Sequence, residues 1–275
     1  MKKIIFKVTI ILNYNIMSNK RTKRIINEIK ELEDSSSILE QSGIYFHFDE
    51  SNISNIYAML VGPENTPYEK GFYFFKFEYP INYPMQPPVA KYYTQGLLLN
   101  QISKSAFHVR FNPNLYTCGK VCLSMLNTWS GPGWVPTNTI SNVLVAIQAL
   151  VLNDFPLTNE PGFEHAVKKD LMRYNEVISY ANMKISVLQM INKPPSEFLF
   201  FKKKMCEIFM KNIDYYRNYI LTQNDEMKDK FFDSPAYNMR LIPEYDLLLK
   251  ELTKTEEDVL NNDFLEKMNV NVNSA

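Results

Sequence analysis

The chain has 275 residues, enough to bury a substantial core in one or two domains. Its 30 basic residues balance 30 acidic residues, so the net charge indicates neither nucleic acid nor an anionic membrane as a partner. The three cysteines lack CxxC pairs and the histidine spacing of a zinc site. They favour a reducing setting, so we expect a cytoplasmic or nuclear protein.

Residues 1–16 combine a basic start with an apolar run, as a signal peptide does. Lys7 interrupts the run, no small-residue cleavage site follows, and the stretch is too short to span a bilayer. Met17 and Ser18 then read as a fresh N-terminus. We therefore expect residues 1–16 to be an extension that the working domain does not need, with a signal peptide as the alternative.

Residues 20–34 are predicted to form an amphipathic helix, with Ile25, Ile29 and Leu32 on one stripe. Its first turn carries four basic residues, namely Lys20, Arg21, Lys23 and Arg24. Basic side chains at a helix N-terminus oppose the helix dipole, so they do not serve helix stability. They form either a solvated face or a docking site for a partner.

A Ser/Gly-rich linker is expected over 35–43, followed by antiparallel strands over 44–49, 56–61, 72–79 and 89–94. The third strand alternates Tyr73, Phe75, Phe77 and Tyr79 with Phe74, Lys76 and Glu78, the pattern of a half-buried strand. Turn formers and prolines separate the strands. The following residues, 95–109, have no functional interpretation, and His108 among them is read as a surface or packing residue.

The stretch 110–136 carries the residues of greatest chemical interest. Its Asn-Pro-Asn segment, 112–114, cannot run as regular helix because proline lacks an amide donor and restricts the residue before it. Cys122 follows a turn at Gly119 and lies between two apolar neighbours. Asn114, eight residues upstream, can fold back and offer amide N–H donors to an oxyanion that develops beside the thiol.

The remainder of the chain is predicted to be helical. Residues 139–152 form a core helix with an apolar face that includes Leu150, and Thr137 or Thr139 can cap it. The loop 153–164 leads to a long helix that ends at Pro194. Another helix runs through apolar positions from 198 to 220, a further one covers 243–254, and a polar tail follows residue 269.

These motifs resemble the ubiquitin-conjugating (E2) enzyme family, in which the active cysteine lies eight residues after His-Pro-Asn. Asn114 and Cys122 keep that spacing, and Asn112, which replaces the histidine, can still hydrogen bond to backbone. The Gly-Pro-x-x-Thr-Pro-Tyr turn (62–68), Tyr-Pro-x-x-Pro-Pro (83–88) and Trp134-Val-Pro136 also fit. Four additional residues between the cysteine and Trp134 resemble the large Z-type subgroup.

The resemblance implies an α+β chain with the UBC fold. That fold has an N-terminal helix, a four-stranded antiparallel meander, an active-site loop and C-terminal helices. We expect the UBC core over 17–190, after the extension at 1–16, and a helical C-terminal extension over 191–275.

The resemblance also implies a reaction. An activating enzyme (E1) would pass ubiquitin or a ubiquitin-like protein to Cys122 as a thioester, and a substrate lysine would attack it, alone or with an E3 ligase. Asn114 would stabilise the oxyanion, and Glu160 would position the amine, although Glu160 is equally well read as a solvated loop carboxylate. No metal or cofactor is expected, because E1 uses the ATP, and neither nucleic acid nor a membrane is expected as a partner.

In this family the basic first helix docks the activating enzyme, which would assign that role to Lys20, Lys23 and Arg24. Met85, in the proline-rich loop, and Pro136 match the family surface that meets ligases and the activating enzyme. These five residues are therefore the partner-binding candidates.

Two other functions compete with this interpretation. One is a catalytically inactive E2-fold adaptor that binds ubiquitin, which the presence of Cys122 and Asn114 disfavours. The other is a cysteine hydrolase, which needs a base within hydrogen-bond reach, whereas the histidines at 47, 108 and 165 lack a protease-like sequence context. Thioester exchange is less demanding, since one thiolate replaces another of similar energy. Cys122 is therefore better suited to receive an acyl group than to cleave an amide.

Overall fold

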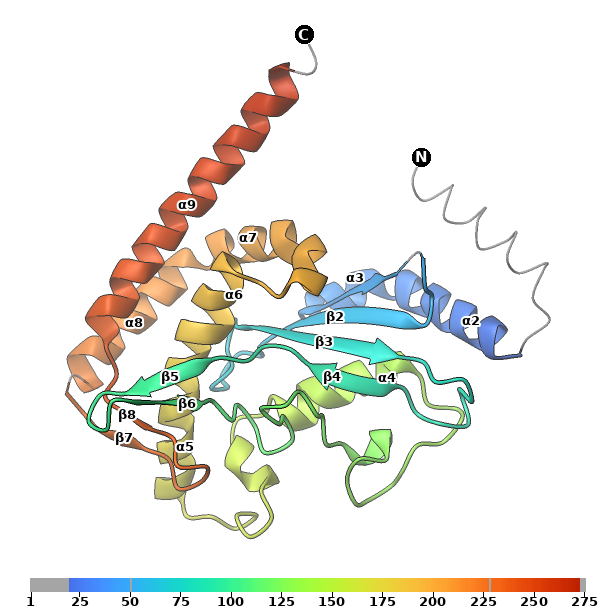
Figure 1. Ribbon diagram of the computed structural model, residues 1–275, viewed down its shortest axis with the longest axis horizontal. Helices are drawn as coiled ribbons and strands as arrows, with labels where there is room; N and C mark the ends of the chain where they lie inside the picture. Colours follow the sequence, from blue (N-terminus) through green and yellow to red (C-terminus); the bar gives the residue numbers. More distant parts are fainter. Residues whose placement is uncertain (1–19, 50, 228, 273–275) are drawn as a thin grey trace.

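The computed structural model describes residues 20–49, 51–227 and 229–272, with side chains described up to residue 261 (Figure 1). The expectation for residues 1–16 lies outside the described residues. Helix α2 spans Lys20–Asp34, as predicted, and the stripe formed by Ile25, Ile29 and Leu32 is buried. Within the described ranges, no helix has both the length and the hydropathy needed to cross a membrane.

The predicted linker after α2 is wrong, because residues Ser36–Gln41 form a short helix, α3. Leu39 in this helix is 6% exposed and belongs to the hydrophobic core. Burial of this one apolar side chain outweighs the low helix propensity of the serines around it.

The predicted four-stranded antiparallel meander is confirmed, with strand order β1-β2-β3-β4. The strands are β1 (Ile44–Phe48), β2 (Asn55–Val61), β3 (Phe72–Glu78) and β4 (Val89–Tyr92). Ile56 of the central strand β2 pairs with Phe48 on one side and with Phe77 on the other. This fold matches the expected UBC architecture of N-terminal helix, sheet and C-terminal helices.

Strand β3 is more deeply buried than its alternating pattern predicts. Tyr73, Phe74 and Phe75 are all 0% exposed, so both faces of the strand are covered at this point. The second cover is the 3-10 segment Ser196–Phe201, whose Phe198 ring lies 4.9 Å from the Phe74 ring between centroids. The half-buried prediction was wrong here because residues more than 100 positions away in sequence supply the second layer.

Helix α4 (Ile140–Ala146) begins at Thr139, which forms the predicted N-cap together with the side chain of Asn142. A π-helical segment, Ile147–Val151, continues it. Leu150 is 59% exposed instead of lying on the core face. The wider π turn changes the angular period of the side chains, which turns Leu150 away from the stripe expected at 3.6 residues per turn.

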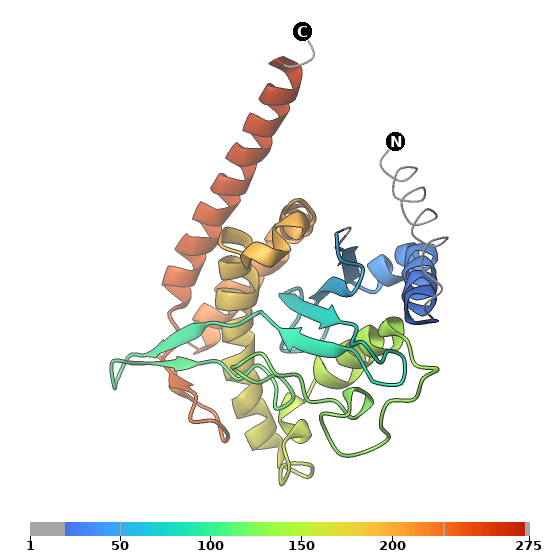
Figure 2. The ribbon, with the colours of Figure 1, turned by 45° about the vertical axis from the view of Figure 1, so that its right-hand side comes forward.

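The predicted long helix is confirmed as α5 (Lys168–Ala181), a π-helical segment (Asn182–Gln189) and α6 (Met190–Asn192), which end before Pro194. Beyond it the chain forms two helices where one was predicted, α7 (Lys202–Lys211) and α8 (Ile213–Met227). The last helix, α9, extends over Tyr245–Val272, well past the predicted end. Figures 1 and 2 show α9 packed beside α8 and then running away from the body.

Two small hairpins were not predicted. Strands β5 (Leu97–Asn100) and β6 (Ser105–His108) lie within residues 95–109, for which the sequence suggested no function. Strands β7 (Phe232–Asp233) and β8 (Arg240–Leu241) lie in the C-terminal extension, between α8 and α9. Strands of two to four residues leave too little alternation in the sequence to be recognised.

Candidate active site

Cys122 and Asn114 are joined by two hydrogen bonds. The backbone N–H of Cys122 donates to the carbonyl oxygen of Asn114 at 2.8 Å, and Asn114 Nδ2 donates to the carbonyl oxygen of Cys122 at 2.6 Å. Gly119, with φ +91°, closes the turn between them, and its carbonyl oxygen accepts a bond from the Tyr92 N–H at 2.8 Å. The loop that carries the cysteine is therefore tied to the end of strand β4.

Asn112 holds this loop from inside the protein. It is 0% exposed, its Nδ2 donates to the carbonyl oxygen of Val151 at 2.6 Å, and its Oδ1 accepts from the N–H of Asn114 at 2.8 Å. Asn112 Nδ2 also lies 3.1 Å from the hydroxyl of Tyr68, which itself donates to the carbonyl oxygen of Phe111. As expected, Asn112 makes backbone hydrogen bonds at the position where the family has histidine.

A groove with a volume of about 250 Å³ opens beside the cysteine loop. Asn114, Leu123, Trp129, Leu150 and Glu164 are among the residues that line it. Trp129 is 41% exposed and the exposed Leu150 adds apolar surface, while Asn114, Asn159 and Glu164 supply polar groups, so the lining is mixed. This role of Leu150 could not be predicted from the sequence, because the π turn that exposes it has no local signal.

The thiol itself is covered. Cys122 is 1% exposed, whereas Cys118 is exposed and Cys206 is partly buried. Thr128 braces the chain on both sides of Cys122, since its hydroxyl donates to the carbonyl oxygen of Val121 and accepts from the N–H of Leu123. The thiol is therefore reachable from solution only after local opening of this site.

The 153–164 loop reaches the cysteine loop through Asn159. Asn159 Nδ2 lies 3.0 Å from the carbonyl oxygen of Leu150 and 3.4 Å from Oδ1 of Asn112. The neighbouring Glu160 is partly buried, and its carboxylate accepts a hydrogen bond from the hydroxyl of Tyr237 in the C-terminal extension. Glu160 is thus turned toward the extension, and Glu164, four residues later, is the carboxylate that lines the groove.

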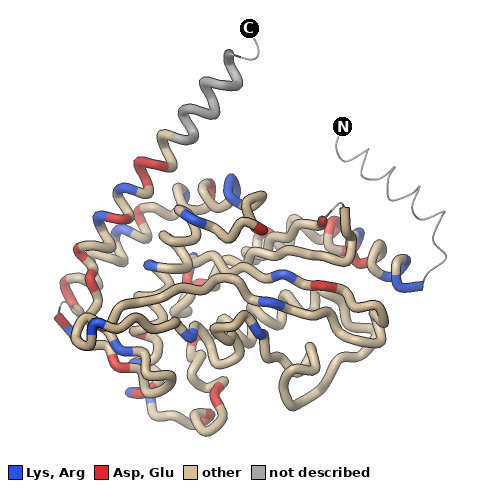
Figure 3. Tube along the Cα trace, in the orientation of Figure 1, with Lys and Arg blue, Asp and Glu red and all other residues tan. Residues whose placement is uncertain are grey.

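The basic residues of α2 differ in their surroundings. Lys20 and Lys23 are exposed, and Figure 3 shows basic residues at the start of this helix. Arg24 is drawn inward: its Nε lies 2.5 Å from Oε1 of Glu28, and its Nη2 donates to the carbonyl oxygen of Asn138 at 2.7 Å. Glu28 is 2% exposed and also accepts a bond from the N–H of Ile140 at the start of α4.

Met85 is 74% exposed, and Pro136 is exposed as well. Their loops are held together because the indole N–H of Trp134 donates to the carbonyl oxygen of Pro84 at 2.7 Å. Arg24 contacts the same two loops, through Asn138 and through the Tyr83 ring 6.0 Å away. The structure therefore brings the predicted partner-binding elements together, while Cys122, Asn114 and Glu160 belong to a separate set of loops.

Among the residues that the structure describes, no group of three or more His, Cys, Asp or Glu side chains is arranged to hold a metal ion.

Comparison with known proteins agrees with the family resemblance noted in the sequence. Residues 24–182 match the family described as ubiquitin-conjugating enzyme. Over 221 residues the chain is 36% identical to ubiquitin-conjugating enzyme E2 Z of Danio rerio, covering 78% of this chain and 64% of that protein. Over 212 residues it is 38% identical to ubiquitin-conjugating enzyme E2 Z of Homo sapiens, covering 72% and 56% respectively. The chain thus spans about three fifths of the length of these curated relatives.

Among solved structures, the E2 domain of a Toxoplasma gondii ubiquitin conjugating enzyme aligns with a TM-score of 0.42 at 22% identity. That alignment covers 61% of this chain and 99% of the other.

Proposed function

Because this chain belongs to the ubiquitin-conjugating enzyme family, we propose that it is an E2 enzyme that carries ubiquitin or a ubiquitin-like protein on Cys122. An E1 delivers the modifier as a thioester, and the chain transfers it to a substrate lysine, alone or with an E3 ligase. The reciprocal bonding of Cys122 and Asn114 is the main support, since it places the cysteine beside an amide donor, and Asn114 itself lines the adjacent groove.

The first step is an exchange between thiols. The Cys122 thiolate attacks the thioester carbonyl carbon on E1, a new C–S bond forms, and the E1 thiolate leaves. The two thioesters are similar in energy, so this step needs no strong base in the site. ATP is consumed earlier by E1, and the chain therefore needs no cofactor of its own.

The second step forms an amide. The lysine amine attacks the carbonyl carbon, the C–N bond forms, the C–S bond to Cys122 breaks, and the amine loses a proton to solvent or a nearby base. Negative charge develops on the carbonyl oxygen before the C–S bond breaks, and a preorganised amide donor stabilises that charge. Asn114 is the donor that we assign to this charge, because its Nδ2 already hydrogen bonds to the backbone carbonyl oxygen of Cys122.

The groove supports an acyl group at the end of an extended peptide. Its volume of about 250 Å³ is too small for a folded domain, and Leu123, Trp129 and Leu150 supply apolar contact. A flexible C-terminal tail that ends in glycine fits these dimensions.

For the partner surfaces we propose that Lys20 and Lys23 of α2 bind E1 and that the exposed Met85 and Pro136 bind an E3 ligase or E1. Arg24 supports this surface through its ion pair with Glu28. A persistent free thiol is compatible with the cytoplasm or nucleus, where thiols stay reduced.

The burial of Cys122, at 1% exposure, favours one competing function, an inactive adaptor. Incubation with E1, ATP and ubiquitin or a ubiquitin-like protein, followed by a non-reducing gel, separates the two. A band shift that a reducing agent removes supports the enzyme. Absence of the shift with every modifier tried, together with retained binding of free ubiquitin, supports the adaptor.

A further inference from the structure

The β7–β8 hairpin of the C-terminal extension is firmly attached next to the candidate active site. Phe232 and Met239 are both 0% exposed, so the hairpin has its own buried anchors. Asp233 forms an ion pair with Arg173 of α5 at 2.9 Å, and the backbone nitrogen of Arg110 lies 3.2 Å from the sulfur of Met239. The tip of the hairpin is therefore held at a defined position.

Tyr237, at that tip, contacts both loops of the candidate active site. Its hydroxyl donates to the carboxylate of Glu160 in the 153–164 loop. Its ring lies 5.1 Å from the guanidinium of Arg110, which donates to the carbonyl oxygens of Asn112 and Pro113 at 3.2 and 2.7 Å. One side chain thus joins the loop before Cys122 to the loop that lines the groove.

The backbone conformation at Tyr237 is energetically unfavourable for a residue with a bulky side chain. Tyr237 has φ +63° and the next residue, Asn238, has φ +52°. Asparagine tolerates the left-handed region, but a bulky tyrosine does not adopt it readily. The contacts of Tyr237 with Glu160 and Arg110 are what hold its side chain in this place.

The hydroxyl remains a donor at neutral and mildly alkaline pH. Burial and the Glu160 carboxylate raise the pKa of Tyr237 well above its ordinary value of 10. The other groups that face the pair are Arg110, which opposes this shift, and two tyrosines at positions 116 and 174. The bond from a neutral phenol to a carboxylate is charge-assisted and therefore stronger than a bond between neutral groups.

We propose that Tyr237 is a positioning residue for the transfer reaction: it anchors Glu160 and so holds the 153–164 loop along the groove. The residues on either side of Glu160, Asn159 and Pro161, both line the groove beside Asn114, so anchoring Glu160 fixes its two neighbours. The C-terminal extension thereby contributes to the active site. This inference rests on the proposed E2 function.

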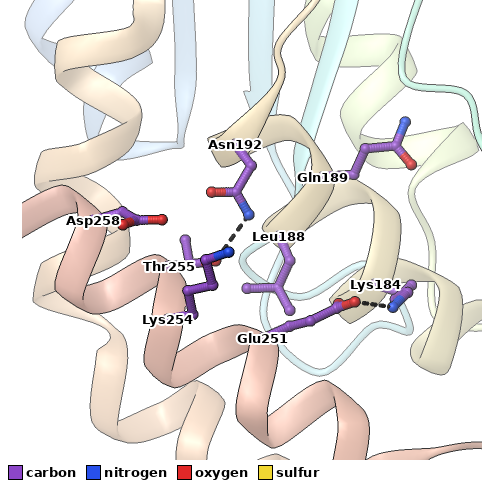
Figure 4. Close-up of a pocket in the computed structure, with 8 residues that line it drawn as sticks. All are labelled: Lys184, Leu188, Gln189, Asn192, Glu251, Lys254, Thr255 and Asp258. Carbon is purple, nitrogen blue, oxygen red and sulfur yellow. Dashed lines mark hydrogen bonds and ion pairs between the residues drawn. The ribbon is translucent and has the colours of Figure 1, made fainter.

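The experiment compares Tyr237→Phe with a matched loss of a hydroxyl elsewhere in the extension. Thr255 of α9 is 1% exposed, and its hydroxyl accepts a bond from Nδ2 of Asn192 at 2.8 Å (Figure 4). Thr255→Val therefore removes one contact between α9 and the end of the long helix without touching the candidate active site. The thioester is preformed, and its single-turnover discharge to free lysine is followed from pH 7 to 9.

Tyr237→Phe is expected to charge normally and to discharge about three- to tenfold more slowly, since small misplacements of reacting groups have effects of this size or larger. The ratio of the Tyr237→Phe discharge rate to the wild-type discharge rate should be the same at every pH from 7 to 9. Tyr237→Phe combined with Glu160→Ala should be no slower than Glu160→Ala alone, because the two residues act through one contact. Thr255→Val should discharge at the wild-type rate.

Amide hydrogen exchange supplies a readout that does not need activity. Exchange within 157–164 should be faster in Tyr237→Phe and unchanged in Thr255→Val. The positioning role would be overturned if Tyr237→Phe showed wild-type rates of both discharge and amide exchange. It would also be overturned if the double variant discharged more slowly than Glu160→Ala by the same factor that Tyr237→Phe imposes on the wild type. If the wild-type chain accepts no modifier from E1, the proposed E2 function fails, and the exchange comparison then decides by itself whether Tyr237 anchors the loop.

Discussion

The side-chain amide of Asn114 donates a 2.6 Å hydrogen bond to the backbone carbonyl oxygen of Cys122. This contact gives Asn114 a part in shaping the resting cysteine loop, beside the catalytic part proposed for it. The two parts predict different kinetics, because loop shape affects both thioester formation and discharge, whereas oxyanion stabilisation matters most where charge develops on oxygen.

We expect the oxyanion role to dominate, so that Asn114→Ala charges nearly normally from E1 but discharges to free lysine about 10²- to 10³-fold more slowly, as for the loss of one oxyanion donor. Single-turnover assays of each step measure the two rates separately. Equal slowing of both steps would show that the bond to the Cys122 carbonyl, and with it loop structure, is the main role of Asn114. Discharge at the wild-type rate would contradict both roles.

Cys122→Ser should abolish the adduct that reducing agents remove and leave an oxyester that resists them. Cys118→Ser and Cys206→Ser should both still form the labile adduct, because Cys118 is an exposed turn residue and Cys206 lies in α7. Non-reducing gels with E1, ATP and modifier check all three variants. A normal labile adduct on Cys122→Ser would assign the nucleophile elsewhere.

The burial of Cys122 predicts its reactivity toward small reagents. At 1% exposure it reacts only when the site opens, while Cys118 is exposed in the folded state. Iodoacetamide should label Cys122 about tenfold or more slowly than Cys118, which corresponds to an opening cost of ~1.4 kcal/mol or more. Mass spectrometry after timed labelling gives both rates, and labelling in denaturant serves as the control, where the rates should become similar. Faster labelling of Cys122 in the folded protein would mean that the site is open in solution.

Asn112→Ala should lower the free energy of unfolding by about 1–3 kcal/mol, because it leaves the buried carbonyl of Val151 without its donor. Urea denaturation measures the loss. Asn153→Ala is a suitable comparison, since its Nδ2 also donates to a backbone carbonyl, that of Leu150, but at an exposed site. Equal effects of the two substitutions would indicate that the burial of Asn112 is not what makes its bonds important.

The ion pair between Lys76 and Glu197 predicts how pH affects docking of the extension. The hydrogen bond from Lys76, 2.8 Å away, lowers the pKa of Glu197 below its ordinary value of 4.5. A lowered folded-state pKa means that the stabilisation is present above the unfolded-state pKa and is lost as the pH falls through the folded-state pKa.

Glu197→Gln should therefore cost about 0.2–1 kcal/mol near pH 7, a small value because Glu197 is 40% exposed. The difference from wild type should shrink as the pH falls below about 4. Urea denaturation at pH 7 and at pH 3 provides the comparison. An unchanged difference at pH 3 would exclude the carboxylate charge as its cause.

Elements that carry a strong local signal follow from the amino-acid sequence alone. The apolar stripe of α2 predicted its bounds, and Thr139 was recognised as a candidate cap of α4, because periodicity and capping act within a few residues. The spacing of Asn114 and Cys122 likewise identified the candidate site, since one tight turn at Gly119 is enough to join them.

Which residues meet across long stretches of sequence depends on tertiary packing. Phe198 covers the second face of β3, and the hydroxyl of Tyr237 reaches Glu160 across 77 positions of sequence. Neither contact follows from a local pattern, because each depends on how the long helix and the extension pack against the sheet. Leu150 lies at the groove for a related reason: a π turn exposes a side chain that the regular helical period assigns to the core.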